Sequence, residues 1–130
     1  MARLLEQFKK NEDVEVLIML VLAILFFLGA FYAGFLLFDS HRRMVKPLEF
    51  VVTTHVSCAA LGILCVIASL ILQYEKNVFY SLLLLLATGI GGLFLFKKKF
   101  SNEIKPLLPI VAHASLGLMA ITALVLTIFK

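Results

Sequence analysis

Two histidines with matching surroundings are the residues of this chain best suited to metal chemistry. His55 and His113 each lie several residues inside an uncharged apolar stretch, and each is followed two positions later by a serine, Ser57 or Ser115. Ionisable side chains inside a membrane are rare and usually functional, and neutral imidazole is a common metal ligand. The pair therefore predicts a metal-centred site inside a helical bundle.

The rest of the chain predicts a membrane protein built from four helices. Of its 130 residues, 62% are hydrophobic and only 15% are charged, which excludes an ordinary soluble domain. Four runs lack Asp, Glu, Lys and Arg and have about the 17–25 residues that a spanning helix needs. They are residues 16–38, 50–74, 78–96 and 107–129. Because the connections are short, we expect one all-α domain over residues 1–130, an integral membrane four-helix up-down bundle.

The polar residues near the ends of these runs bear on processing and orientation. Three acidic residues, Glu12, Asp13 and Glu15, precede a first run that is too long for a signal peptide, so we expect the first helix to be retained. Seven basic residues lie on the side of loops 39–49 and 97–106, against five on the other side. This bias favours a bacterial-type inner or plasma membrane protein with both loops in the cytoplasm.

The chain also matches itself when it is shifted by 58 residues. The shift superposes Gly34 on Gly92, His55 on His113 and Ser57 on Ser115, with further Leu, Phe and Ile matches. The pattern is what a tandem repeat of two helical hairpins would give; convergence and chance are the alternatives. In either case the second and fourth helices run in the same direction, so both imidazoles should lie one to two turns below the same surface and can face each other.

Small residues follow each histidine on its own helical face, one and two turns later. They are Ala59 and Gly62 on the second helix, and Gly117 and Ala120 on the fourth. Helix packing alone can explain small residues in membrane helices. A flat macrocycle ligated by both histidines would need the same clearance, however, and the combination favours one non-covalent haem b with His55 and His113 as its axial metal ligands.

Basic and hydroxyl side chains could complete such a site. Haem propionates near the loops could pair with Arg42, Arg43, Lys46, Lys97, Lys98, Lys99 and Lys105. Four hydroxyl residues are candidate partners for the ligands, although such groups more often bond their own backbone; they are Thr53, Thr54, Ser57 and Ser115. His41, in the first loop, could replace one of the ligands, but a solvated loop histidine is the simpler interpretation.

The stretch His-x-Ser-Leu-Gly at residues 113–117, with histidines on alternate helices of a four-helix bundle, resembles b-type cytochromes of the cytochrome b561 and ferric-reductase-like families. Members typically carry two stacked histidine pairs, whereas this chain has one intramembrane pair. The resemblance implies a single haem b near one surface, and an electron carrier or oxidoreductase subunit rather than a stand-alone enzyme. The expected partners are membrane lipid, other redox subunits or a second copy of the chain, with a quinone as a further candidate.

Two other functions compete with this prediction. His55, Cys58 and His113 could form a copper or zinc site, and a cofactor-free structural subunit would use the histidines only for packing. No set of residues suggests a hydrolase or a nucleic-acid-binding protein. No Cys-x-x-Cys-His pattern occurs, which excludes covalent haem attachment of the c type.

Overall fold

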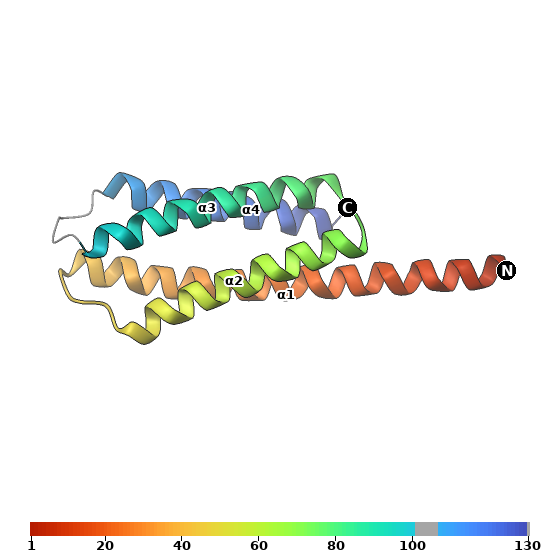
Figure 1. Cartoon of the computed structure of the whole chain (residues 1–130), viewed down its shortest axis with the longest axis horizontal. Coiled ribbons are helices and arrows are strands. Elements are labelled where there is room, and N and C mark those ends of the chain that lie inside the picture. The colour runs from red at the N-terminus through yellow and green to blue at the C-terminus, as the bar shows by residue number, and fades with distance from the viewer. Residues whose placement is uncertain (101–106, 130) are drawn as a thin grey trace.

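The computed structural model describes residues 1–100 and 107–129 and consists of four α-helices (Figure 1). They are α1 (Ala2–Arg42), α2 (Glu49–Leu72), α3 (Lys76–Phe100) and α4 (Leu107–Ile128). The described residues include no strand. The predicted all-α fold with four helices is therefore confirmed.

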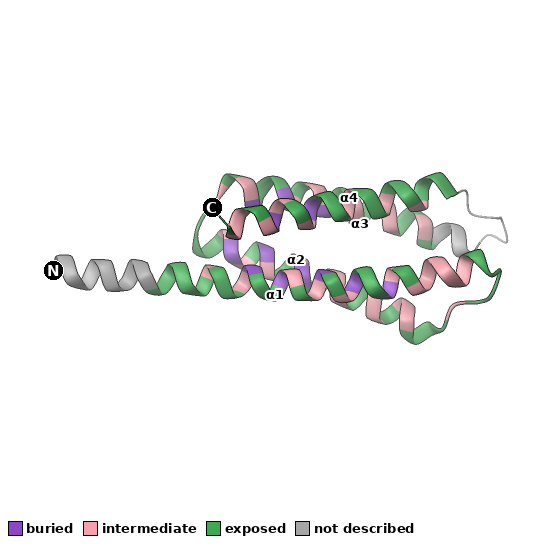
Figure 2. Cartoon of the chain, turned by 180° about the vertical axis from the view of Figure 1, so that it is seen from behind, coloured by how far each residue is buried: buried purple, intermediate pink, exposed green. Residues whose placement is uncertain are grey.

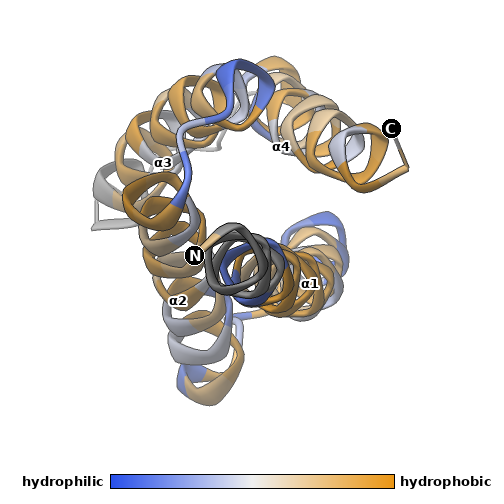
Figure 3. Ribbon diagram, turned by 90° about the vertical axis from the view of Figure 1, so that its right-hand side faces the viewer, coloured by the Kyte–Doolittle hydropathy of each residue, from blue (hydrophilic) through white to orange (hydrophobic). Residues whose placement is uncertain are grey.

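All four helices are long and apolar enough to cross a membrane. The candidate spans are Asn11–Arg42, Glu49–Leu72, Lys76–Phe96 and Leu107–Ile128. Seen end-on, the helices are largely apolar around their circumference, and polar residues gather at their ends (Figure 3). In lipid this pattern suits helices, because a helix satisfies its own backbone hydrogen bonds. The chain is therefore an integral membrane protein by length and composition.

The helices alternate in direction, and the two sequence-adjacent hairpins are the tightest packing units. α1 packs most extensively against α2, and α3 against α4, whereas the contacts of α1 with α4 and of α2 with α3 are fewer. α2 and α4 consequently run parallel on one diagonal of the bundle (Figures 1 and 3). Residues on these two helices that lie at the same distance from the loops can meet across the centre.

The helix ends are set by local backbone conformations and hydrogen bonds, which a hydropathy pattern does not predict. After α1, Met44 adopts a left-handed conformation with φ 57°, while the N–H of Val45 donates to the carbonyl of Ser40 and that of Met44 to the carbonyl of His41. This is a Schellman ending. α2 stops at Leu72 rather than at the predicted residue 74, because Gln73 is extended. α3 then starts at Lys76, and the Glu75 carboxylate accepts hydrogen bonds from the backbone N–H groups of Asn77 and Val78 in its first turn.

Most of the buried side chains lie in the half of the bundle away from the two long loops (Figure 2). The core there contains residues from all four helices, namely Leu20, Ala23, Phe27, Val66, Val78, Leu85, Ala120 and Leu124. We call residues 30–61, 86–96 and 107–119 the loop-side half; among them only Ala30 and Ala33, both on α1, are buried. The loop-side half therefore has fewer buried side chains than the other half.

Candidate cofactor site

His55 and His113 meet across the diagonal of the bundle, in the loop-side half. His55 lies six residues after the first residue of α2, and His113 lies six residues after the first residue of α4. At about 1.5 Å per residue both sit roughly 9 Å below the helix starts. Their ring centroids are 6.1 Å apart, and the ring planes are inclined by 60°. Both side chains are half-buried.

Each imidazole is held by a backbone carbonyl of the neighbouring helix in its own hairpin. Nδ1 of His55 lies 2.7 Å from the carbonyl oxygen of Ala30, and Nδ1 of His113 lies 2.9 Å from that of Thr88. A carbonyl oxygen can only accept, so Nδ1 of each ring must carry the hydrogen and donate. In a neutral imidazole this leaves the lone pair on Nε2. Among the described residues, Nδ1 makes the only hydrogen bond found for either ring.

The two halves repeat this arrangement with the 58-residue spacing seen in the sequence. Ala30 and Thr88 are 58 positions apart, as are the two histidines, and each histidine follows its carbonyl partner by 25 residues. Gly34 and Gly92, also 58 apart, lie against the same two rings. Sequence reasoning matched these glycines but did not assign them to the site. The signal that could have identified them is that Gly34 and Gly92 are separated by the same 58 residues as His55 and His113.

Two of the four small residues after the histidines lie against other protein atoms. A Cβ on Gly62 would lie 2.6 Å from a ring carbon of Phe27, and Ala120 is fully buried in the four-helix core. A Cβ on Gly117 would meet the side chain of Thr88 at 3.5 Å, and Ala59 is half-buried. Because protein atoms occupy the space beside Gly62 and Ala120, these two residues serve helix packing rather than clearance for a ring.

The hydroxyl candidates contribute little to the histidine pair. Thr53 bonds the carbonyl of Glu49 on its own helix, as hydroxyls in membrane helices commonly do. Ser57 and Ser115 are exposed, and Thr54 is half-buried. The partners of the imidazoles are instead the backbone carbonyls of α1 and α3.

The basic residues lie at the loop end but are partly engaged already. Arg42 and Arg43 pair with the same carboxylate of Asp39, at 3.0 and 2.8 Å. Lys46 is exposed. Lys105 falls outside the described residues, as do the side chains of Lys97, Lys98 and Lys99. Arg42 and Arg43 would thus have to leave Asp39, or share it, to pair with an anionic group.

The three residues of the copper or zinc alternative do not form a cluster. The Cys58 sulfur points to α1, where it lies 3.3 Å from the position of a Cβ on Gly29. Across the part of the chain that the structure describes, no three His, Cys, Asp or Glu side chains gather closely enough to hold a metal ion. A site made by His55, Cys58 and His113 is not assembled here.

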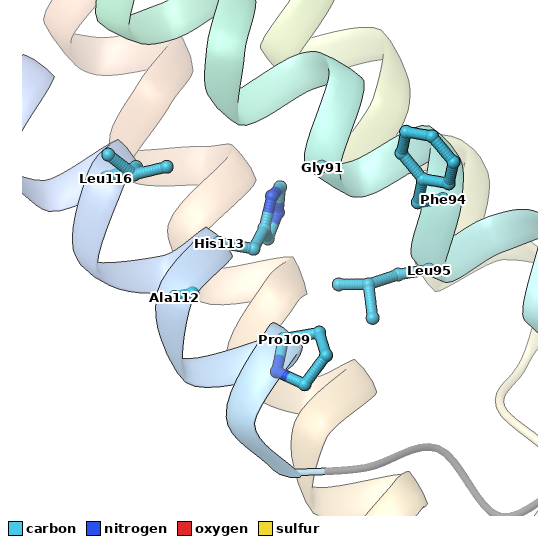
Figure 4. A pocket seen from close by; sticks show the side chains of 7 residues that line it. All are labelled: Gly91, Phe94, Leu95, Pro109, Ala112, His113 and Leu116. Carbon is cyan, nitrogen blue, oxygen red and sulfur yellow. The ribbon is translucent and has the colours of Figure 1, made fainter.

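A pocket of about 250 Å³ opens beside His113, between α3 and α4 (Figure 4). Its other walls are apolar side chains and one glycine, from Gly91, Phe94, Leu95, Pro109, Ala112 and Leu116. The pocket is smaller than the roughly 300–1,000 Å³ of typical ligand sites. A large ring could therefore not be held by this pocket alone.

Comparisons with protein-family models, with curated proteins and with solved structures find no match to this chain.

Proposed function

We propose that this chain is a membrane electron-transfer protein that binds one haem b between His55 and His113, as a subunit of a larger redox complex. The observation that carries the proposal is the histidine pair itself. Two imidazoles from diagonal helices have centroids 6.1 Å apart, and both are fixed through Nδ1 by backbone carbonyls. Metal-ligating histidines commonly use their second nitrogen in this way, which orients the ring and fixes the tautomer.

The separation of the rings suits two axial ligands of one metal. With metal–nitrogen bonds of about 2 Å on opposite sides, and each centroid about 1 Å behind its nitrogen, the centroids would be about 6 Å apart. Rotation of the rings about the ligand axis leaves that distance unchanged, so the 60° inclination is compatible with it.

The packing of the bundle supplies a second argument. In the loop-side half only Ala30 and Ala33 are buried, whereas the other half has a core drawn from all four helices. Close packing is the rule in protein interiors. A flat apolar ring between the two hairpins would provide the loop-side half with the contacts that its side chains do not make.

The residues of the chain would have distinct tasks around the ring. His55 and His113 would hold it, and the carbonyls of Ala30 and Thr88 would orient them. Held by these two histidines, a haem would supply a one-electron couple for electron transfer. Among the described residues, Lys46 and the two arginines paired with Asp39, Arg42 and Arg43, would supply positive charge for the haem propionates.

The location of the pair near one surface implies exchange with a donor or acceptor on that side. We place the two long loops on the cytoplasmic side of a bacterial-type inner membrane, because that side of the chain carries more basic residues than the other. One haem near one face does not form a complete path across the bilayer. A partner cytochrome subunit, a second copy of the chain or a quinol would extend it.

A reduced-minus-oxidised spectrum of the purified protein, expressed with haem supply, tests the proposal. We expect the bands of a six-coordinate low-spin haem in the wild type, and their loss in both His55→Ala and His113→Ala. His41→Ala is the matched control and should keep the bands. If the wild type carries no haem, or if both intramembrane variants keep a six-coordinate low-spin haem, the proposal is wrong.

Cys58→Ala separates the haem site from a copper or zinc site. Because the sulfur points to Gly29, its removal should leave the haem spectrum unchanged. Colourless protein that holds stoichiometric copper or zinc, and loses it in Cys58→Ala, would support the metal-handling alternative instead.

A further inference from the structure

Two glycines lie directly against the two imidazoles, closer than most side chains could. An ideal Cβ on Gly34 would be 3.1 Å from Cε1 and 3.2 Å from Nδ1 of His55. On Gly92 it would be 3.0 Å from Cε1 of His113. Carbon atoms in good contact are about 3.5–4.0 Å apart, so a methyl group at either position would displace the ring.

The displacement would occur where each ring makes its hydrogen bond. The acceptors, Ala30 and Thr88, lie four residues before Gly34 and Gly92 and therefore on the same helical faces. Each Cα–Cβ bond of a helix tilts toward the N-terminus, so a side chain at the glycine would lie over the preceding turn and its carbonyl. That carbonyl already accepts from the glycine N–H within the helix, and its second lone pair serves the imidazole.

We propose that Gly34 and Gly92 are positioning residues that hold His55 and His113 as Nδ1–H tautomers, so that both rings keep Nε2 free for a ligand. The glycines act by leaving the carbonyls of Ala30 and Thr88 accessible across the hairpin. The proposal concerns the imidazoles themselves and does not depend on which ligand they bind. It thus goes beyond the proposed function and can hold if that function fails.

The third helix provides its own control. Gly89 has no atom within 4 Å of its ideal Cβ, so an alanine there meets open space. Gly91, next to Gly92, would make only an ordinary 3.8 Å contact with Nδ1 of His113. Of these three neighbouring glycines, only Gly92 lies close enough for its substitution to move the ring.

Ring nitrogen NMR of protein labelled with ¹⁵N-histidine, prepared without haem in lipid, tests the proposal. The chain has only three histidines, and His55→Ala and His113→Ala assign the signals. In the wild type we expect both intramembrane rings to carry the hydrogen on Nδ1. Gly92→Ala should shift His113 to the Nε2–H form, Gly34→Ala should do the same to His55, and Gly89→Ala should change neither.

The two rings report on each other, which distinguishes positioning from misfolding. If His55 keeps its Nδ1–H tautomer in Gly92→Ala, its hairpin is intact and only the His113 ring has lost its hydrogen bond. If Gly92→Ala changes the tautomer of both rings, or leaves His113 as the Nδ1–H tautomer, the glycine does not position that ring. Wild-type rings protonated on Nε2 would also overturn the proposal. Because no haem is present, failure of haem binding in the other experiment leaves this result unaffected.

Discussion

Replacing Gly62 by alanine should weaken the bundle by forcing apart α1 and α2. The new Cβ would lie 2.6, 2.7 and 2.9 Å from three carbon atoms of the Phe27 ring. To restore ordinary contact distances, the ring would have to retreat by about 1 Å. Phe27 is only 4% exposed and belongs to the four-helix core, so the ring has little space to retreat into. Overpacking of this kind costs about 1–3 kcal/mol.

Gly89→Ala is the matched control for the same chemical change. It adds the same methyl group in open space, and alanine is favoured over glycine inside a helix by about 0.5–1 kcal/mol. Because that gain is common to both variants, the free energy of unfolding of Gly62→Ala should fall below that of Gly89→Ala by the overpacking cost alone, about 1–3 kcal/mol. Both are measured by SDS titration in mixed micelles, followed by far-UV circular dichroism, with the same cofactor content because a bound ligand adds stability.

A double-mutant cycle identifies the contact responsible. In a Phe27→Leu background the ring is gone, and Gly62→Ala should cost much less than in the wild type, with an interaction energy of about 0.5–3 kcal/mol. If Gly62→Ala is as stable as Gly89→Ala, that result contradicts the close contact between the Phe27 ring of α1 and Gly62 of α2. An equal cost of Gly62→Ala in both backgrounds would show that Phe27 is not the obstacle.

Three further substitutions test the packing and the helix ends, with the same unfolding assay. Leu124→Ala should destabilise the protein by about 1–3 kcal/mol through lost contacts, since Leu124 is fully buried. Leu126→Ala, at a 63% exposed position, is the control and should cost much less. Equal costs would contradict the burial of Leu124 in the four-helix core. Glu75→Ala removes the carboxylate that accepts from two backbone N–H groups of α3 and should cost about 1 kcal/mol, whereas no loss would contradict the cap. Met44→Gly should stabilise by a few tenths to about 1 kcal/mol, because φ is 57° there and glycine adopts that conformation without strain; a decrease would argue against the Schellman ending.

The apolar pattern predicted the four helices well but not their ends. The run at residues 16–38 identified the apolar part of α1, whereas the helix extends from Ala2 to Arg42. Hydropathy reports which residues avoid water, while the end of a helix depends on where backbone groups find other partners. The left-handed Met44, the extended Gln73 and the carboxylate of Glu75 set those ends.

The small residues show a second limit of sequence reasoning. Spacing placed Ala59, Gly62, Gly117 and Ala120 on the faces of the histidines, and from this alone they could have made room for a ring or for a neighbouring helix. Their surroundings decide between the two, because Phe27 takes the space beside Gly62 and the core encloses Ala120. A helical face can be read from a single segment, but what lies opposite it depends on another segment.

The sequence by itself determined four membrane helices, parallel second and fourth helices, and two histidines at one depth, because length, hydropathy and alternation of direction are properties of the chain order. Tertiary structure alone decided what surrounds those histidines. The carbonyls of Ala30 and Thr88 carry no side-chain signature, and Gly34 and Gly92 gain their importance from the rings that approach them. The packing within each hairpin makes those contacts and sets the tautomer of each imidazole, whereas the packing of one hairpin on the other brings the two ring centroids to 6.1 Å.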